Sequence, residues 1–307
     1  MKTERTERLV IMIDFCHIAP TPHLDLVKDR KTHLLLAHLV EDDPDYVKFY
    51  SDLKKNNRGL TYILDNSAFE MYKQGRPMYD SVELITMAQR IQADYVVMSD
   101  YPNEKSTKTI NAAEVMGPTL KDKGFGTFFC PQSKIADTED LFACFNWAAQ
   151  SDLVDYIGVS ILAIPNAYGV EKGNKLQRFV SRFMFMQDLH DSGILDTAKV
   201  NGKKIHLLGM LDGPNEIRLM SQFSEYIDTW DSSAAIWYGL HAGRMFDASP
   251  TGILEGKYEE EVDFNYTATA QNVLTAKTNK ETIDELMITY LPSYITDEEW
   301  FVTDSEL

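Results

Sequence analysis

Asp65, Asp100 and Asp231 each end an apolar segment, and the three segments lie far apart in the chain. Small residues such as Ser67 and Ser232 follow closely, so a ligand can approach these carboxylates. A carboxylate in such a place can act as a nucleophile, a general acid or base, or a metal ligand. The alternative is that each one caps the helix that follows. Three together indicate one site assembled from strand ends.

The rest of the chain has the alternation that a parallel sheet needs. Apolar segments alternate with helical patterns of ten or more residues, which is typical of βαβ units. The expected strands are Leu9–Phe15, Leu60–Leu64, Tyr95–Met98, Gly126–Cys130, Tyr156–Ser160, Ile205–Leu208 and Ile227–Trp230. The expected helices are 82–92, 109–121, 138–150, 175–192 and 215–224.

A barrel of this kind needs an eighth strand, which we expect either around Ala234–Tyr238 or within an irregular segment. The sequence therefore predicts an α/β fold, a (β/α)8 barrel over residues 1–246. Residues 247–307 are predicted to form a small acidic extension packed on the barrel. In such a barrel the site lies at the C-terminal ends of the strands, where the three aspartates would meet.

The composition favours a folded protein of a reducing compartment. Apolar residues make up 44% of the 307, enough for a full core. No apolar run approaches the roughly 20 residues of a membrane helix, and the mixed-charge start does not resemble a signal peptide. Cys16, Cys130 and Cys144 are odd in number and widely spaced, which argues against a disulfide framework. We expect a cytoplasmic protein without a membrane partner.

The formal net charge of −17 bears on the choice of partner. Proteins that bind nucleic acid usually present a basic surface, because phosphate contacts supply most of the non-specific affinity. Lys and Arg gather in three patches, at 28–31, 54–58 and 199–204. Because of these patches, the acidic total does not exclude binding to nucleic acid. A solvated acidic surface explains the total charge equally well.

Six segments between about residues 60 and 245 resemble the tRNA-guanine transglycosylase superfamily, in the family's order. Tyr62–Glu70 is similar to the family's Asp-Ser-Gly-Gly-Phe/Tyr-Gln, and Tyr226–Asp231 to its Asp-Met-Phe-Asp. The other four are similar to the strand end that reads the base and to Val-Gln-Gly, Gly-Gly-Leu-Ala and Tyr-Leu-Met-Gly. They are Val96–Pro102, Phe129–Ser133, Gly158–Ala163 and His206–Met210.

The resemblance implies base exchange through a covalent intermediate. Asp231 would attack C1′ of a guanosine and displace guanine, and Asp65 would move the proton at N9 of the leaving and entering bases. The resemblance also implies a pocket for a base that has left its stack. The residues that it assigns to this pocket are Asp100, Gln132, Ser160, Leu162, Phe69 and Leu208.

Differences between this sequence and the tRNA enzymes of the family bear on which nucleic acid is the substrate. The tRNA enzymes carry a zinc site with closely spaced cysteines late in the chain, and here no cysteine follows Cys144. A shorter, zinc-free chain is most similar to the DNA 7-deazaguanine transglycosylases that phages often encode. The resemblance then implies exchange of guanine in DNA for a base such as preQ0, which shields phage DNA from restriction enzymes. A phage-encoded protein would act in the host cytoplasm.

Three alternatives stay open at this point. The first is the same chemistry on tRNA, and the second is a barrel that binds nucleic acid without turnover. The third is a carboxylate-based glycosidase that hydrolyses the bond and leaves an abasic product. A homodimer or an accessory protein is also open, as a source of the basic surface that this acidic chain lacks.

Several other residues invite a functional interpretation. Gly239–Arg244 is expected to be a glycine-flanked loop at the mouth of the site, where His241 and Arg244 could contact phosphate. His206 lies on an apolar strand and is interpreted as a core histidine. Cys16 and His17 lack the spacing of a metal site, and no nucleotide-binding glycine loop is present, so we expect neither metal nor cofactor.

Overall fold

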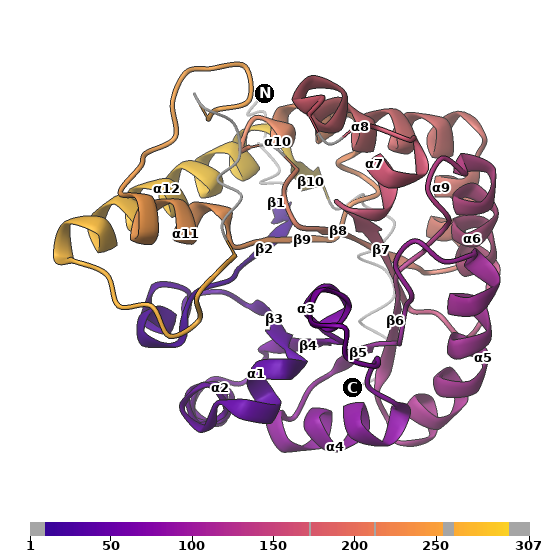
Figure 1. The fold of residues 1–307 in the computed structure, drawn as a ribbon, viewed down its shortest axis with the longest axis horizontal. Helices are drawn as coiled ribbons and strands as arrows, with labels where there is room; N and C mark the ends of the chain where they lie inside the picture. Colours follow the sequence, from indigo (N-terminus) through magenta and orange to yellow (C-terminus); the bar gives the residue numbers. More distant parts are fainter. Residues whose placement is uncertain (1–9, 172, 212, 254–260, 295–307) are drawn as a thin grey trace, which may run out of the picture.

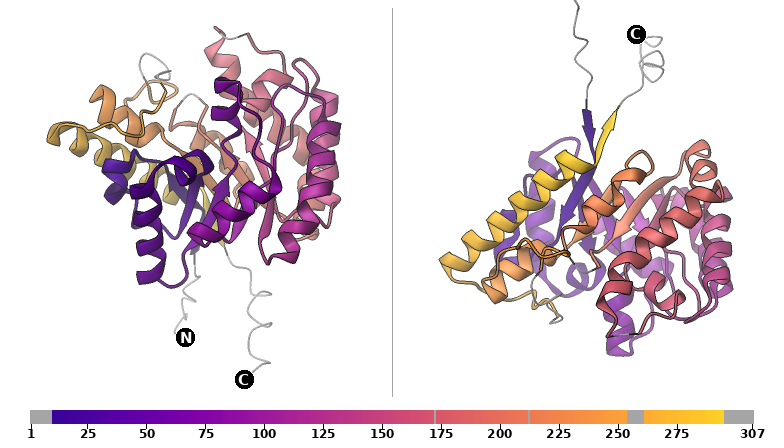
Figure 2. Two further views of the ribbon diagram at one scale, coloured as in Figure 1. Left: turned by 60° about the horizontal axis from the view of Figure 1, so that its bottom comes forward. Right: turned by 90° about the horizontal axis from the view of Figure 1, so that it is seen from above.

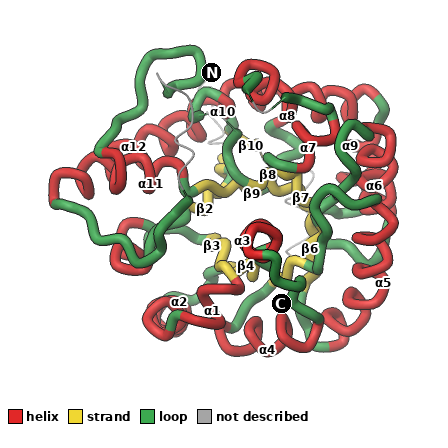
Figure 3. The backbone as a smooth tube through the Cα atoms, viewed as in Figure 1, coloured by secondary structure: helices red, strands yellow, loops and turns green. Residues whose placement is uncertain are grey.

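The computed structural model describes residues 10–171, 173–211, 213–253 and 261–294. Within these ranges, parallel strands form a ring that helices surround on the outside (Figure 1, Figure 3). The strands of the ring are β2 (Asp14–His17), β3 (Thr32–Leu36), β4 (Thr61–Asp65), β5 (Tyr95–Val97), β6 (Gly126–Phe129), β7 (Tyr156–Ser160), β8 (Lys204–Leu208) and β9 (Thr229–Ser232).

The helices follow the strands in the order that βαβ units require. They are η1 (Thr21–Leu26), α1 (Ala37–Asp42), α2 (Pro44–Asn56), α3 (Ala68–Gln74), α4 (Ser81–Ile91), α5 (Ser106–Asp122), α6 (Thr138–Gln150), α7 (Ala163–Ala167), α8 (Lys175–Asp191), α9 (Ile194–Val200), α10 (Glu216–Leu219), η2 (Met220–Phe223), α11 (Ala234–Ala242) and α12 (Ala270–Tyr290). The sheet order is β2-β9-β8-β7-β6-β5-β4-β3, and all its neighbours are parallel. The predicted (β/α)8 barrel is therefore confirmed.

Two strand predictions were wrong. The segment Ala234–Tyr238 is part of α11, and the strand that sequence reasoning missed is β3, all five of whose residues are buried. Its run of leucines continues into α1, so no change of periodicity marks the strand. The predicted strand Leu9–Phe15, whose first residue lies outside the described ranges, is two strands. β2 belongs to the barrel, while β1 (Val10–Met12) pairs antiparallel with β10 (Pro292–Tyr294) at one end of it (Figure 2).

The strands bury side chains on both faces. One cluster, with Leu34, Ile63, Val97, Phe128 and Cys130, fills the inside of the barrel. A larger cluster packs the outer faces of the strands against the helices. Cys130 lies in the inner cluster and packs there as a small core residue.

The ring has a seam between β2 and β3. Among the described strands, no ladder of backbone hydrogen bonds joins these two. A side chain bridges them instead, because the carboxylate of Asp14 on β2 accepts a hydrogen bond of 2.6 Å from the backbone N–H of Thr32 on β3. The barrel is thus a sheet whose two edges face each other.

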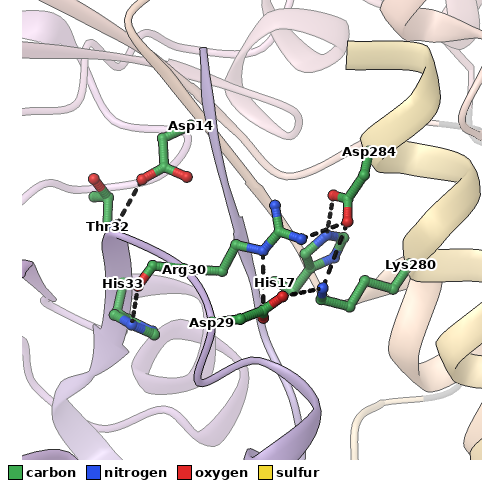
Figure 4. A network of polar contacts seen from close by, with 8 residues as sticks. All are labelled: Asp14, His17, Asp29, Arg30, Thr32, His33, Lys280 and Asp284. Carbon is green, nitrogen blue, oxygen red and sulfur yellow. Dashed lines mark hydrogen bonds and ion pairs between the residues drawn. The ribbon is translucent and has the colours of Figure 1, made fainter. Parts of the chain in front are cut away.

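Figure 4 shows the charged network beside this seam. Arg30 and His17 contact Asp284 of α12, and Lys280 of α12 lies 2.9 Å from Asp29. Burial alone would raise the pKa of Asp284, but the hydrogen bond from His17 and the charge of Arg30 lower it to about 2. The described part of the C-terminal extension is therefore tied to the barrel by ion pairs at the seam.

Four aspartates at strand starts link neighbouring strands in pairs. Each accepts a hydrogen bond of 2.6–2.8 Å from a backbone N–H near the start of the adjacent strand. The pairs are Asp14 with Thr32, Asp94 with Tyr62, Asp155 with Thr127, and Asp228 with Ile205. We call them the strand-start aspartates. They are structural, and they lie at the N-terminal end of the barrel, opposite the predicted site.

The helix pair α11 and α12 packs closely where Gly239 faces Ala276. A Cβ atom added to Gly239 would lie 2.2 Å from the Cα and 2.3 Å from the backbone N of Ala276. Because these are backbone atoms of a long helix, they cannot yield without moving α12. This contact fixes α12 against the barrel.

Replacing Gly239 with Ala should therefore separate the two helices and lower the free energy of unfolding by about 3 kcal/mol. Urea unfolding followed by circular dichroism measures this loss. Gly173→Ala is the matched control, because nothing lies within 4 Å of its added Cβ. Equal unfolding midpoints for the two variants would contradict the packing argument.

Candidate active site

The C-terminal ends of the strands surround a cavity of about 460 Å³. Eight of the ten residues predicted from the sequence line it, and they come from separate strands and the loops that follow them. These residues are Asp65, Phe69, Asp100, Gln132, Ser160, Leu162, Leu208 and Asp231. His241 and Arg244 are not among the residues that line it.

Asp231 lies near the end of β9 with 5% of its surface exposed. Its Oδ1 accepts two hydrogen bonds, one of 3.0 Å from the backbone N–H of Gly209 and one of 2.9 Å from His206 Nε2. Among the described residues, hydrogen bonds hold only this one of the two carboxylate oxygens. The carboxylate therefore has a fixed orientation toward the cavity that it lines.

His206 is fully buried on β8 and joins Asp231 to Thr229. An ionised carboxylate can only accept, so Nε2 of His206 carries the proton that it shares with Asp231. In the neutral ring Nδ1 then accepts from the hydroxyl of Thr229, at 2.6 Å. The interpretation of His206 as a satisfied core histidine is right about its burial, but it missed the partner, which is the candidate nucleophile.

Asp100 and Gln132 meet across the cavity floor. Gln132 donates through Nε2 to one oxygen of Asp100, and Asn66 donates to the other at 2.7 Å. Asn66 also donates to the backbone carbonyl of Met98, at 2.7 Å, which fixes its amide. Burial raises the pKa of Asp100 to about 6, although the two amide donors oppose this rise.

Asp65 ends β4, and the loop after it turns sharply. Ser67 has a φ of +54°, in the left-handed region, and its backbone N–H donates to Asp65 at 2.9 Å. Burial, together with the negative charge of Glu70 nearby, raises the pKa of Asp65 well above its usual range. Burial also raises the pKa of Glu70, which lines the same cavity. This side of the cavity thus holds carboxyl groups that retain a proton more readily than in water.

Apolar side chains line the cavity between these polar groups, together with Ser160. Phe69 is 40% exposed at the rim, and Leu208 lies at the end of β8. The hydroxyl of Ser160 accepts from the backbone N–H groups of Leu162 and Ala163, both at 3.2 Å. Since Ser160 already occupies the N–H of Leu162, an exocyclic oxygen of a ligand would share that donor.

The predicted loop over Gly239–Arg244 is wrong. Residues 234–242 are helical, and Gly243, with a φ of +61°, ends α11. The ring of His241 stacks on Trp237, with centroids 4.6 Å apart, and the backbone of Arg244 bonds to Tyr238. The two glycines misled the prediction, because Gly239 serves the close packing of α12 and only Gly243 ends a helix.

The basic patches lie at the other end of the barrel. Lys54 pairs with the strand-start aspartate Asp94, and Lys203 donates to the backbone carbonyls of Ser151 and Val154. At the cavity itself, carboxylates dominate the charge, and Lys73 at its edge pairs with Glu261. The cavity therefore suits a ligand rich in hydrogen-bond donors.

Sequence reasoning missed Asn66, Glu70 and His206 as neighbours of the predicted site. All three lie inside segments that carry the family resemblance. Membership in these segments could have indicated that they lie near the site, whereas their residue types alone did not. Within the described ranges, no three His, Cys, Asp or Glu side chains gather so that they could hold a metal ion. No helix of the described chain is both long and apolar enough to span a membrane.

Comparison with known proteins identifies the fold and no family. No family model and no curated protein matches the chain. Similar solved structures include phosphoribosyl anthranilate isomerase from Thermus thermophilus, with 8% identity and a TM-score of 0.39 over 88% of this chain and 98% of that one. The alpha subunit of tryptophan synthase from Legionella pneumophila has 11% identity and a TM-score of 0.43, over 88% and 91%.

The catalytic domain of a chitinase from Pyrococcus furiosus is similar at 10% identity, with a TM-score of 0.45 over 91% of this chain and 97% of that one. At such low identity, the comparisons leave the reaction of this chain to be argued from the site.

Proposed function

We propose that this protein is a transglycosylase that exchanges guanine in DNA for a 7-deazaguanine base. One observation carries the proposal. A single cavity holds an oriented carboxylate, Asp231, a carboxyl group with a raised pKa, Asp65, and a carboxylate–amide pair suited to guanine, Asp100 with Gln132. Each matches the role that the sequence resemblance assigns to it.

The first half of the reaction forms a covalent adduct. An oxygen of Asp231 attacks C1′ of the deoxyribose, the bond from C1′ to N9 breaks, and its electron pair stays on guanine. Asp65 gives its proton to the leaving base, so guanine departs neutral. The raised pKa of Asp65 supports this role, because burial makes the carboxyl group retain a proton more readily than it would in water.

The second half reverses these steps with a different base. Asp65, now ionised, takes the N9 proton of the incoming 7-deazaguanine, and N9 attacks C1′. The bond from C1′ to Asp231 breaks, and the carboxylate is regenerated. The incoming base, and not water, attacks C1′. The product is therefore an intact nucleotide and not an abasic site.

The base is read by the groups on the cavity floor. Guanine offers two adjacent donors, at N1 and N2, and the oxygens of Asp100 are acceptors of the right kind. Phe69 and Leu208 supply apolar surfaces on which a flat ring can lie. The base must leave the duplex stack to reach this cavity. We favour DNA over tRNA because the chain has no cysteine after Cys144 that could build the zinc site of the tRNA enzymes.

The test is a paired incubation with guanine-containing duplex DNA and with bulk tRNA, each supplied with preQ0. Digestion to nucleosides and mass spectrometry identify the polymer that gained the deazaguanine. Incorporation into DNA supports the proposal in full, and incorporation into tRNA alone overturns the choice of polymer. An abasic product would instead identify a hydrolase, and no change in either polymer would contradict the proposed exchange.

The raised pKa of Asp100 predicts how base binding depends on pH. Folding raises this pKa from 3.8 to about 6, so without a ligand the group contributes stability at low pH that is lost as the pH rises through 6. The ionised form is the better acceptor for guanine. The affinity for free guanine should therefore rise about tenfold per pH unit up to about pH 6 and level off above it.

Isothermal titration calorimetry with guanine between pH 5 and pH 8 measures how this affinity depends on pH. Asp65 and Glu70 also carry raised pKa values in the same cavity, so a control must isolate Asp100. Asp100→Asn removes the titrating group and should give weak binding that no longer changes around pH 6. The same pH dependence in this variant would assign the effect to the other two carboxyl groups.

A further inference from the structure

Arg182 is a buried cation with no place in the reaction described above. It lies on α8 with 0% of its surface exposed, and its Nε donates to Glu216, also fully buried, at 2.8 Å. The second oxygen of Glu216 accepts from the backbone N–H of Leu211 at 2.8 Å. Burying such a pair costs desolvation energy that its attraction often fails to recover. Stability alone is therefore a weak reason for its presence.

Three further hydrogen bonds of Arg182 reach the backbone at the ends of β7 and β8. Its Nη1 donates to the carbonyls of Val159 and Leu208, at 3.1 and 3.0 Å, and its Nη2 donates to the carbonyl of Gly209 at 2.7 Å. Leu208 and Gly209 both line the cavity. The guanidinium thus holds the backbone from which the site is built.

One peptide unit connects Arg182 to Asp231. The carbonyl of Leu208 accepts from the guanidinium, and the N–H of the same peptide, that of Gly209, donates to Asp231 Oδ1 at 3.0 Å. In a planar trans peptide these two groups point in opposite directions. A cation at the carbonyl polarises the peptide and strengthens its N–H as a donor, by about 10–30% per bond in a chain of hydrogen bonds.

The next peptide is held as well. Gly209 has a φ of +69°, and its carbonyl accepts from both Arg182 and the indole N–H of Trp230, each at 2.7 Å. A Cβ atom at Gly209 would lie 2.7 Å from the side chain of Ile161. The loop after β8 is therefore fixed on both sides of the N–H that meets Asp231.

We propose that Arg182 is a positioning residue for Asp231, acting through the peptide between Leu208 and Gly209. The guanidinium sets the place of the Gly209 N–H and strengthens it as a donor, and that N–H holds one oxygen of the carboxylate while the other attacks. The role of Asp231 in base exchange rests on the proposed function. The hydrogen-bonded connection from Arg182 to Asp231 does not, so it can be tested without an activity.

The direct test is the amide resonance of Gly209. Of the 16 glycines, only Gly209 follows a leucine, so protein labelled with carbonyl-¹³C leucine and ¹⁵N glycine gives a single carbonyl-correlated amide signal. Arg182→Met should move this amide proton upfield, because its hydrogen bond weakens. Lys203→Met is the control, since Lys203 also donates to backbone carbonyls but at the opposite end of the barrel. The signal should stay in place in that variant.

Kinetics supply the second readout. With duplex DNA and radiolabelled guanine as the probe, Arg182→Met should lower kcat about tenfold at unchanged KM, less than the ~10²–10³-fold loss when a direct donor is removed. Lys203→Met should leave both values unchanged. If Arg182→Met fails to fold because Glu216 is left unpaired, the double variant Arg182→Met/Glu216→Gln removes both charges and keeps the acceptor for Leu211.

The outcomes are separable. A shifted Gly209 signal with a lower kcat supports the inference, and an unmoved signal overturns it whatever the activity. A shifted signal with an unchanged kcat overturns it too, because the connection would then be structural only. If the wild-type protein exchanges no base, the proposed function fails, and the Gly209 signal then tests only the hydrogen-bonded connection from Arg182 to Asp231.

Discussion

Asp231→Asn should abolish formation of the covalent adduct and lower base exchange by about 10⁴-fold or more, as expected when a nucleophile is removed. An amide oxygen is a poor nucleophile toward C1′. When the bond from C1′ to the side chain breaks in the second half of the reaction, an aspartate leaves as a stable carboxylate, and an asparagine cannot. The asparagine still offers an oxygen to Gly209 and His206, so the fold should persist. Denaturing electrophoresis of protein incubated with labelled DNA detects the adduct directly.

The matched control for this prediction is Asp228→Asn. It makes the same substitution three residues upstream, on a strand-start aspartate that bonds to Ile205 at the other end of the barrel. This variant should form the adduct at the wild-type rate. If Asp231→Asn forms the adduct, or if both variants lose it equally, Asp231 is not the nucleophile.

Asp65→Asn should lower turnover by about 10²–10⁴-fold, the usual contribution of a general acid and base. Asparagine can accept the hydrogen bond from Ser67 but cannot protonate the leaving base. In the wild-type protein, release of guanine in a single turnover should decline as the pH rises through the raised pKa of Asp65. In the variant this decline should disappear along with most of the rate.

A neighbouring substitution tests the cause of that pH dependence. The negative charge of Glu70 helps to raise the pKa of Asp65, so Glu70→Gln should move the decline to lower pH. Rapid-quench measurement of guanine release between pH 5 and pH 9 would show the displacement. A decline that stays in place in Glu70→Gln, or that persists in Asp65→Asn, would assign the proton transfer to another group.

The sequence predicted the barrel because its strand and helix signals are local. The helix 138–150 was predicted to the residue, since Asp137 caps it and its apolar residues keep helical spacing. The eighth strand was misplaced because the apolar run of residues 34–40, interrupted only by His38, spans the end of β3 and the start of α1. The first part of this run is a strand because it pairs with β4, which follows only after helices α1 and α2. A local sequence pattern does not show this pairing.

The residues of the site likewise fall into those that the sequence could predict and those that it could not. Carboxylates at strand ends could be predicted, because the parallel fold brings those ends together. Their partners could not, since His206 meets Asp231 across strands and Arg182 reaches the site from a distant helix. Aspartates also stand at strand starts, where they are structural. The position of an aspartate relative to its strand, rather than its residue type, separates the two roles.

The seam between β2 and β3 has a consequence for how this barrel can change over evolutionary time. Ile18, Leu34 and Leu36 bring the cavity wall to this seam, where side chains and not a backbone ladder complete the ring. Because no backbone ladder fixes the separation of β2 and β3, this separation can change without breaking the ladders that join the other strands. The seam is thus a part of the barrel where substitutions can alter the width of the cavity while the rest of the sheet keeps its pairing.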